Sequence, residues 1–217
     1  IDMIRLLVEA GGDALLPSKC DGRNAAQMAA RRGRGDVLRL FAERGIDVGL
    51  EGVDALIAAC ALADSGQTDA LLRRDPTLRG ALVDEGGELL GAFAGIGNTG
   101  GVRCLLDLGV GVDMLYPGDA YFDIPTGSTA LHVAAWRGSS ETMRLLIQRG
   151  ASVNARDGKG HTPLQLAVRA GTRSYWKRRR SLEWVEPLLR AGAAIADIES
   201  PTGWAELDQL LPRHASR

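Results

Sequence analysis

The chain has 217 residues, of which 45% are hydrophobic and 24% are charged, values typical of a well-packed soluble protein that exclude an intrinsically disordered one. Because 26 basic residues face 27 acidic ones, the formal net charge is -1, which excludes a general attraction to nucleic acid or to an anionic membrane. No apolar run approaches the roughly 20 residues that span a bilayer, and no signal peptide is recognisable, so we expect a cytoplasmic protein without membrane contacts.

The first predicted element is an amphipathic helix over residues 3–11. Its apolar residues recur at helical spacing, but no partner helix precedes it, so we interpret it as the second helix of a helix pair. Ile4, Leu7 and Val8 are then expected to form an apolar edge that upstream residues would cover, since the numbering opens with Ile inside a helical pattern.

Three helix pairs follow, each with a first helix, a glycine turn and a second helix. The first opens at Asn24 and closes at Gly45, the second opens at Asp54, and the third runs from Glu88 to Gly109. Each short helix carries one apolar stripe, which a single pair cannot bury alone. Stacking of neighbouring pairs would bury the stripes continuously.

A clear repeat appears in the second half of the chain. Residues 128–138 read Ser-Thr-Ala-Leu-His-Val-Ala-Ala-Trp-Arg-Gly, and residues 161–171 read His-Thr-Pro-Leu-Gln-Leu-Ala-Val-Arg-Ala-Gly, so Thr129 recurs 33 residues later as Thr162. A second apolar helix and a glycine turn follow each copy. A fixed period of this length is typical of a repeat protein.

Local chemistry supports the same helix boundaries. Thr129 and Thr162 are predicted N-caps, and Pro163 suits the first helical turn, where its missing N–H is harmless. Gly150 and Gly192 follow leucine-rich helices, as left-handed C-terminal glycines do.

This pattern resembles the ankyrin-repeat family, whose motif is a Thr-Pro-Leu-His start, two short helices and a hairpin. The resemblance implies an all-α solenoid of paired antiparallel helices and hairpin loops, in one domain over residues 1–217 with about four complete repeats and a partial one at each end. Residues 204–211 are expected to be the closing helix, with Trp204, Leu207, Leu210 and Leu211 on its inner face.

Two insertions break the period. Residues 114–126 lengthen one hairpin by about eight residues and contain Tyr116, Tyr121 and Phe122 in a chain that is only 5% aromatic. Such a loop either contacts a partner through its aromatics or folds them back onto its own repeat.

Residues 173–182 separate the two helices of the last full repeat. This Ser-Tyr-Trp segment, followed by the basic run 177–180, is similar to insertions expected in some bacterial ankyrin proteins, so we predict a bacterial member of the family. Tyr175, Trp176 and Trp184 are expected to pack over neighbouring helices. The basic run is either a solvated face or a contact for an anionic partner.

Ankyrin proteins generally bind partners through hairpin tips and the ends of first helices, and the resemblance carries this surface over to matching positions. The candidate partner-binding residues are Arg31, Arg32, Trp136, Arg137 and Arg169 at helix ends, Arg156 and Lys159 on hairpins, and Tyr116, Tyr121 and Phe122 on the insertion. The excess of basic residues predicts a protein partner with an acidic surface, and Trp136 is the predicted anchor of the contact.

No catalytic residue, metal site or cofactor is predicted. The motif position of His132 implies a structural hydrogen bond between adjacent hairpins, and no phosphate loop, serine elbow or zinc helix occurs. Cys20, Cys60 and Cys104 match neither a disulfide framework nor a zinc site, and we interpret them as reduced thiols.

We therefore expect a monomeric protein-interaction module. Two other functions stay open: a regulatory or substrate-docking segment of a larger enzyme, and a purely structural spacer.

Overall fold

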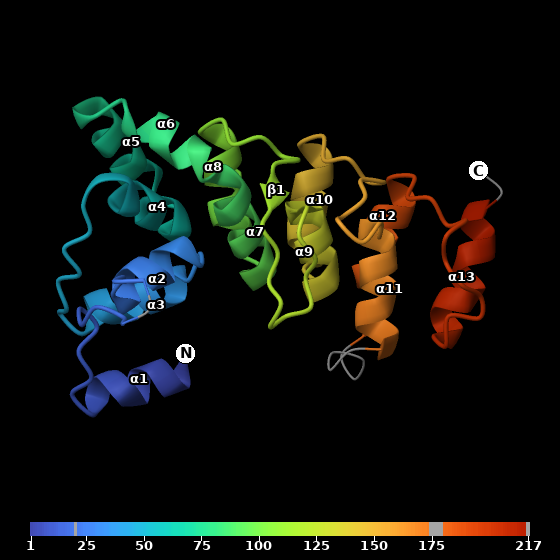
Figure 1. The fold of residues 1–217 in the computed structure, drawn as a ribbon, viewed down its shortest axis with the longest axis horizontal. Coiled ribbons are helices and arrows are strands. Elements are labelled where there is room, and N and C mark those ends of the chain that lie inside the picture. The colour runs from blue at the N-terminus through green and yellow to red at the C-terminus, as the bar shows by residue number, and fades with distance from the viewer. Residues whose placement is uncertain (20, 174–179, 216–217) are drawn as a thin grey trace. The chain divides into compact units, whose positions relative to one another are not determined.

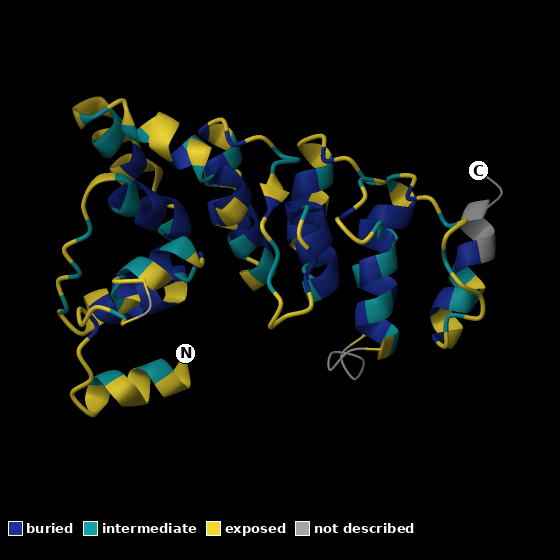
Figure 2. Cartoon of the chain, in the orientation of Figure 1, coloured by how far each residue is buried: buried dark blue, intermediate teal, exposed yellow. Residues whose placement is uncertain are grey.

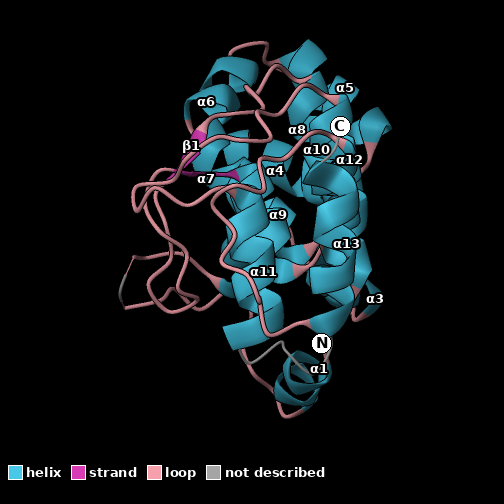
Figure 3. Ribbon diagram, turned by 90° about the vertical axis from the view of Figure 1, so that its right-hand side faces the viewer, coloured by secondary structure: helices cyan, strands magenta, loops and turns pink. Residues whose placement is uncertain are grey.

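The computed structural model describes residues 1–19, 21–173 and 180–215. The chain divides into two compact units, Ile1–Val110 (unit 1) and Gly111–Arg217 (unit 2), and Figure 1 shows the helices of each. Nearly all the regular structure is helical, and the strands are confined to the loop before α9 (Figure 3). In the described part of the chain, no helix is both long and apolar enough to cross a membrane.

Unit 1 contains three helix pairs and two further helices. The pairs are α2 (Ala25–Arg31) with α3 (Gly35–Glu43), α4 (Gly52–Leu62) with α5 (Ser65–Arg74), and α7 (Gly86–Ile96) with α8 (Thr99–Asp107); the further helices are α1 (Asp2–Glu9) and α6 (Leu78–Asp84). Every residue from Ala55 to Ala61 is buried, so α4 is the centre of this unit's core (Figure 2).

Helix α1 agrees with the sequence prediction, whereas the segment after α5 differs from it. No residue of α1 is fully buried: Ile4 and Val8 are half-buried, and Leu7 is exposed, so the predicted apolar edge is present (Figure 2). Where the resemblance to ankyrin repeats implies a hairpin after α5, the chain instead forms α6, whose Leu82 is completely buried in the core.

In its described residues, unit 2 contains two helix pairs, a 3-10 helix, a short strand pair and a terminal helix. The helices are α9 (Ala130–Arg137) with α10 (Ser140–Gln148), α11 (Pro163–Arg173) with α12 (Glu186–Arg190), the 3-10 helix Leu182–Trp184, and α13 (Ala205–Ala215). Strands β1 (Leu115–Tyr116) and β2 (Ser128–Thr129) are antiparallel, with Leu115 opposite Thr129. The all-α repeat architecture predicted from the sequence is therefore present.

The predicted helix boundaries in unit 2 are confirmed. Thr162 Oγ1 accepts a hydrogen bond from the Gln165 amide at 3.3 Å, and α11 begins at Pro163. Gly150 and Gly192 have φ values of 87° and 85°, in the left-handed region that glycine enters without steric cost.

Helix α13 lies at the end of unit 2 with its predicted face inward. Trp204, just before it, is 2% exposed, Leu207 and Leu211 are buried, and Leu210 is half-buried. The Trp204 ring packs against Gly171 of α11, where a Cβ atom would lie 2.6 Å from Cζ3 of the ring. The apolar face of the last helix is thus covered, as the sequence predicts for a closing element.

Candidate functional site

Hydrogen bonds from first helices hold successive hairpins of unit 2 in place. His132 Nδ1 accepts from the Thr129 amide at 3.1 Å, and Nε2 donates to the carbonyl oxygen of His161, 3.0 Å away in the next hairpin. This arrangement confirms the structural role predicted for His132. Because the ring is buried, the pKa of His132 is lowered, and the neutral form is favoured.

The long hairpin before α9 divides its aromatic residues between the core and the solvent. Tyr116 and Ile124 are buried in one apolar cluster, whereas Tyr121 is 89% exposed and Phe122 is 37% exposed. An antiparallel backbone bridge between Asp119 and Ile124 fixes the loop between the buried and the exposed aromatic residues. Tyr116 is consequently a core residue, and its prediction as a partner contact is wrong.

Trp136 is also a core residue, contrary to its prediction as the anchor of a partner contact. The side chain is 7% exposed and packs with Tyr116, Ile124 and Leu166, and Trp184 packs against this cluster. The physical reason is the insertion itself, because Tyr116 and Ile124 cover a helix end that would otherwise face the groove. The packing of Trp184 matches its prediction; Tyr175, Trp176 and residues 177–179 lie outside the described part of the chain.

Tyr121 and Phe122, which we call the aromatic tip, contact each other and a basic helix end. Their rings are perpendicular, at an interplanar angle of 86° and a centroid separation of 4.9 Å. The guanidinium of Arg137 lies 4.9 Å from the centre of the Phe122 ring, and burial lowers the pKa of Arg137. Three predicted partner-binding residues, Tyr121, Phe122 and Arg137, therefore lie together.

The remaining basic candidates of unit 2 are paired with acidic residues. Arg156 bonds Asp197 at 2.7 Å, while Asp123 lies 3.3 Å from Arg169 and 3.7 Å from Lys159. These carboxylates come from neighbouring loops, because Asp123 is on the insertion and Asp197 on the next hairpin. The surface has mixed charge.

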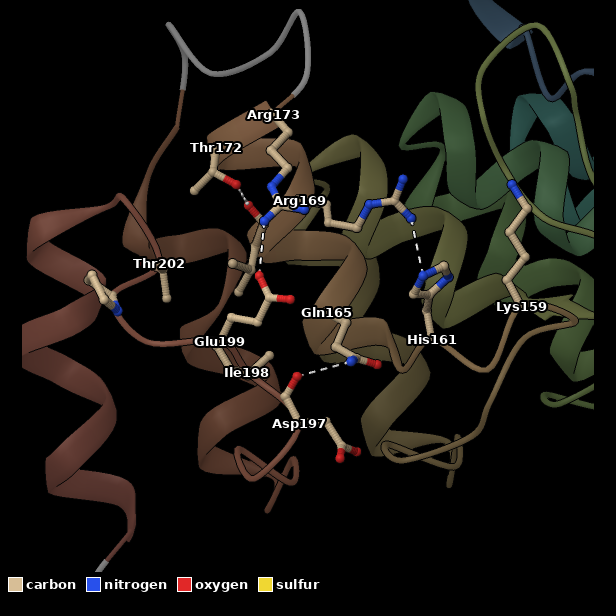
Figure 4. Close-up of a pocket in the computed structure, with 12 residues that line it drawn as sticks. Lys159, His161, Gln165, Arg169, Thr172, Arg173, Asp197, Ile198, Glu199 and Thr202 are labelled. Atoms are coloured by element: carbon tan, nitrogen blue, oxygen red, sulfur yellow. Dashed lines mark hydrogen bonds and ion pairs between the residues drawn. The ribbon is translucent and has the colours of Figure 1, made fainter.

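A pocket of about 420 Å³ opens beside these ion pairs between the last two hairpins of unit 2 (Figure 4). His161 stands at one side, with Nε2 3.3 Å from Nη1 of Arg169 and Nδ1 3.4 Å from Oδ2 of the buried Asp157. Arg173 reaches across the pocket to Glu199 at 3.0 Å.

Sequence reasoning missed the acidic side of this pocket. Asp197 and Glu199 belong to a segment without a motif, and only its position opposite α11 brings them to Arg156 and Arg173. The signal that could have located the segment is its distance from the hairpin at 156–161, which is one repeat period plus the insertion at 173–182.

Arg31 and Arg32 lie in unit 1 and differ in environment. Arg31 bonds Asp54 at 2.8 Å and also pairs with Glu85; the hydrogen bond to Glu85 is the main cause of its raised pKa. Arg32 is exposed. Arg31 thus joins α2, α4 and the start of α7, a structural role that the sequence interpretation did not assign to it.

Among the described residues, no group of three His, Cys, Asp or Glu side chains is placed to hold a metal ion. Cys60 and Cys104 carry free thiols in this structure, and Cys20 is outside the described residues.

Comparison with known proteins identifies the repeats. The family profile described as "Ankyrin repeats (3 copies)" matches residues 56–157 and 89–198. The chain is 52% identical over 46 residues to mouse protein phosphatase 1 regulatory subunit 12A, covering 21% of this chain and 4% of that protein. It is 30% identical over 141 residues to the Arabidopsis thaliana E3 ubiquitin-protein ligase KEG, covering 64% of this chain and 8% of that protein.

A bacterial relative matches as well. A putative ankyrin repeat protein of Rickettsia bellii is 31% identical over 87 residues, covering 33% of this chain and 36% of that protein. The chain therefore spans 4% to 36% of the length of these relatives.

Proposed function

Because the chain belongs to the ankyrin-repeat family, we propose that it is a non-catalytic module that binds a protein partner through unit 2. Ankyrin repeats generally mediate interactions between proteins, and the relative named as a regulatory subunit is consistent with that role. The proposed contact consists of the aromatic tip, Arg137 and the pocket beside His161 and Arg169.

The exposure of Tyr121 carries this proposal. The Tyr121 side chain is 89% exposed, so it adds little buried apolar area to the fold. Its ring nevertheless packs against Phe122, which in turn contacts Arg137. Tyrosine buries a large area at low entropic cost on binding, and tyrosine and arginine are both enriched among residues that dominate interface energies.

The charged residues around the pocket are expected to contribute less to binding than the aromatic tip. An acidic partner would compete with Asp123 and Asp197 for Arg169, Lys159 and Arg156, and exposed ion pairs contribute roughly 0–1 kcal/mol each. We therefore assign most of the affinity to the aromatic tip, and to the charges an effect on association rate and salt dependence.

We extend the proposal to the setting of the protein: a monomer that acts in the cytoplasm of a bacterium. The similarity to the Rickettsia protein supports the bacterial assignment, and the free thiols of Cys60 and Cys104 suit a reducing compartment.

A second function has a specific observation in its favour. The chain covers 4% of a phosphatase regulatory subunit and 8% of a ubiquitin ligase, so the matching repeats in those proteins are small parts of much longer chains. The present residues could in the same way dock substrate for a catalytic domain elsewhere in their gene product. The complete gene sequence discriminates between the two functions.

The test of the main proposal is Tyr121→Ala, with Leu16→Ala as the matched control, since Leu16 is 69% exposed and lies in unit 1. A photo-crosslinking amino acid at position 121 identifies the partner, and calorimetry with the purified partner measures affinity. We expect Tyr121→Ala to weaken binding by about 2 kcal/mol, roughly thirty-fold in Kd, and Leu16→Ala to leave it unchanged. An unchanged Kd for Tyr121→Ala would exclude the aromatic tip as the contact.

A further inference from the structure

Two of the three cysteines meet inside unit 1. Cys60 on α4 is completely buried, Cys104 on α8 is half-buried, and their Sγ atoms are 2.8 Å apart. Because a disulfide bond is about 2.05 Å long, the two sulfurs need to approach by less than about 1 Å to bond. The two residues are 44 positions apart in the sequence, so this proximity is a product of the fold.

The two thiols differ in access and in acidity. The hydrogen-bond contact between the two sulfurs lowers the pKa of Cys104 and so favours its thiolate. The same hydrogen bond, together with burial, raises the pKa of Cys60. Cys104 is thus both the thiol that ionises more readily and the one that solvent reaches, and Cys60 lies directly behind it.

We propose that Cys60 and Cys104 are a redox pair that forms a reversible disulfide when a peroxide oxidises the protein. In the first step, the Cys104 sulfur attacks one oxygen of hydrogen peroxide, the O–O bond breaks, and a sulfenic acid and one water form. In the second step, the Cys60 sulfur attacks the Cys104 sulfur, the S–O bond breaks, and the hydroxide leaves as water with the Cys60 proton. Two thiols and one peroxide give one disulfide and two waters, and a dithiol reductant reverses the bond.

The disulfide would join helices of two adjacent repeats. Helix α4 is the first helix of one pair and α8 the second helix of the next, and the two already pack against each other. A covalent link between them closes a long loop and removes entropy from the unfolded chain. Oxidation is therefore expected to strengthen unit 1 at the interface between these repeats.

The experiment uses the full chain with Cys20→Ser, so that only the proposed pair remains, and hydrogen peroxide as the oxidant. Peptide mapping without reductant is expected to show one linked species that contains residues 60 and 104, with loss of both free thiols. The melting temperature is expected to rise by roughly 5–10 °C on oxidation and to return to its starting value with dithiothreitol.

Single variants separate the pair from adventitious oxidation. Cys104→Ser should lose the linked species and keep its melting temperature in peroxide. Cys60→Ala, which keeps a small apolar side chain in the core, should convert Cys104 to sulfinic acid instead. The proposal is overturned if the parent protein accumulates sulfinic acid at Cys104 without a 60–104 link, or if the link forms without any rise in the melting temperature.

Discussion

In three repeats, the N-terminus of the first helix is capped in the same way by a pair of side chains. An N-cap side chain and the side chain three residues later exchange hydrogen bonds with each other's backbone amides, in the pairs Asn24–Gln27, Thr129–His132 and Thr162–Gln165. In unit 2 the far end of the second side chain bonds the next hairpin: His132 Nε2 donates to His161 O, and Gln165 Nε2 donates to Asp197 O at 3.1 Å. In unit 1, Gln27 Nε2 instead donates to Asp54 on α4 at 2.9 Å. Histidine and glutamine thus fill one geometric role, but only histidine can take up a proton.

This equivalence predicts how stability depends on pH. Since burial lowers the pKa of His132, the unfolded chain binds a proton near pH 6.5, at higher pH than the folded protein does. Stability from this site is complete above that pH and is lost as the pH falls, by at most about 1.4 kcal/mol per pH unit.

We expect His132→Gln to match the wild type in urea unfolding at pH 7.5 and to exceed it at pH 5. Equal losses of stability in both proteins over this range would contradict the role of His132 as the titrating group.

At the scale of elements, the neighbours of a helix decide whether a substitution within it stabilises or destabilises the protein. Gly171 in α11 and Gly80 in α6 both have helical neighbours, and alanine favours a helix over glycine by roughly 0.5–1 kcal/mol. The two sites differ in space, because a Cβ at Gly171 would lie 2.6 Å from the Trp204 ring, whereas a Cβ at Gly80 meets nothing within 4 Å.

Alanine substitution at these two glycines should therefore act in opposite directions. Gly171→Ala is expected to lower the free energy of unfolding by about 1–3 kcal/mol, because the Trp204 ring must move out of its buried position. Gly80→Ala is expected to raise it by about 0.5–1 kcal/mol. Urea unfolding measures both, and stabilisation by Gly171→Ala would show that Trp204 does not hold α13 against α11.

At the scale of the molecule, each of the two units has a buried core of its own. In unit 1 the core follows α4, and in unit 2 it includes the cluster of Trp136, Tyr116 and Leu166. The stability of a repeat array is close to a sum over repeats and their nearest-neighbour interfaces. A destabilising substitution in one core should therefore lower local stability mainly within its own unit.

Trp136→Ala tests this expectation and the corrected position of the side chain. We expect it to cost about 3–5 kcal/mol, with native-state hydrogen exchange accelerated in α9 and α11 and little changed in α4. Leu115→Ala, at a side chain that is 64% exposed in the same unit, should change stability by less than about 0.5 kcal/mol. Equal loss of protection in α4 and α9 would show that the chain unfolds as one cooperative body.

The repeat architecture follows from local signals in the sequence alone. The recurrence of Thr129 at Thr162, the N-caps, Pro163 and the C-terminal glycines all act within a few residues, so they identify the helix pairs and the role of His132 without knowledge of the packing. The inward face of Trp204 and Leu207 follows equally from helical spacing.

Only the tertiary structure decided which candidate residues face the solvent. Trp136 occupies a motif position that faces the groove in the family, but the folding of residues 114–126 over it placed Tyr116 and Ile124 on its ring. Likewise, the pairing of Arg169 with Asp123 and the approach of Cys60 to Cys104 join residues that are distant in the sequence. Periodicity reports which side of a helix is apolar, whereas the identity of the group that covers it depends on loops and long-range contacts that carry no period.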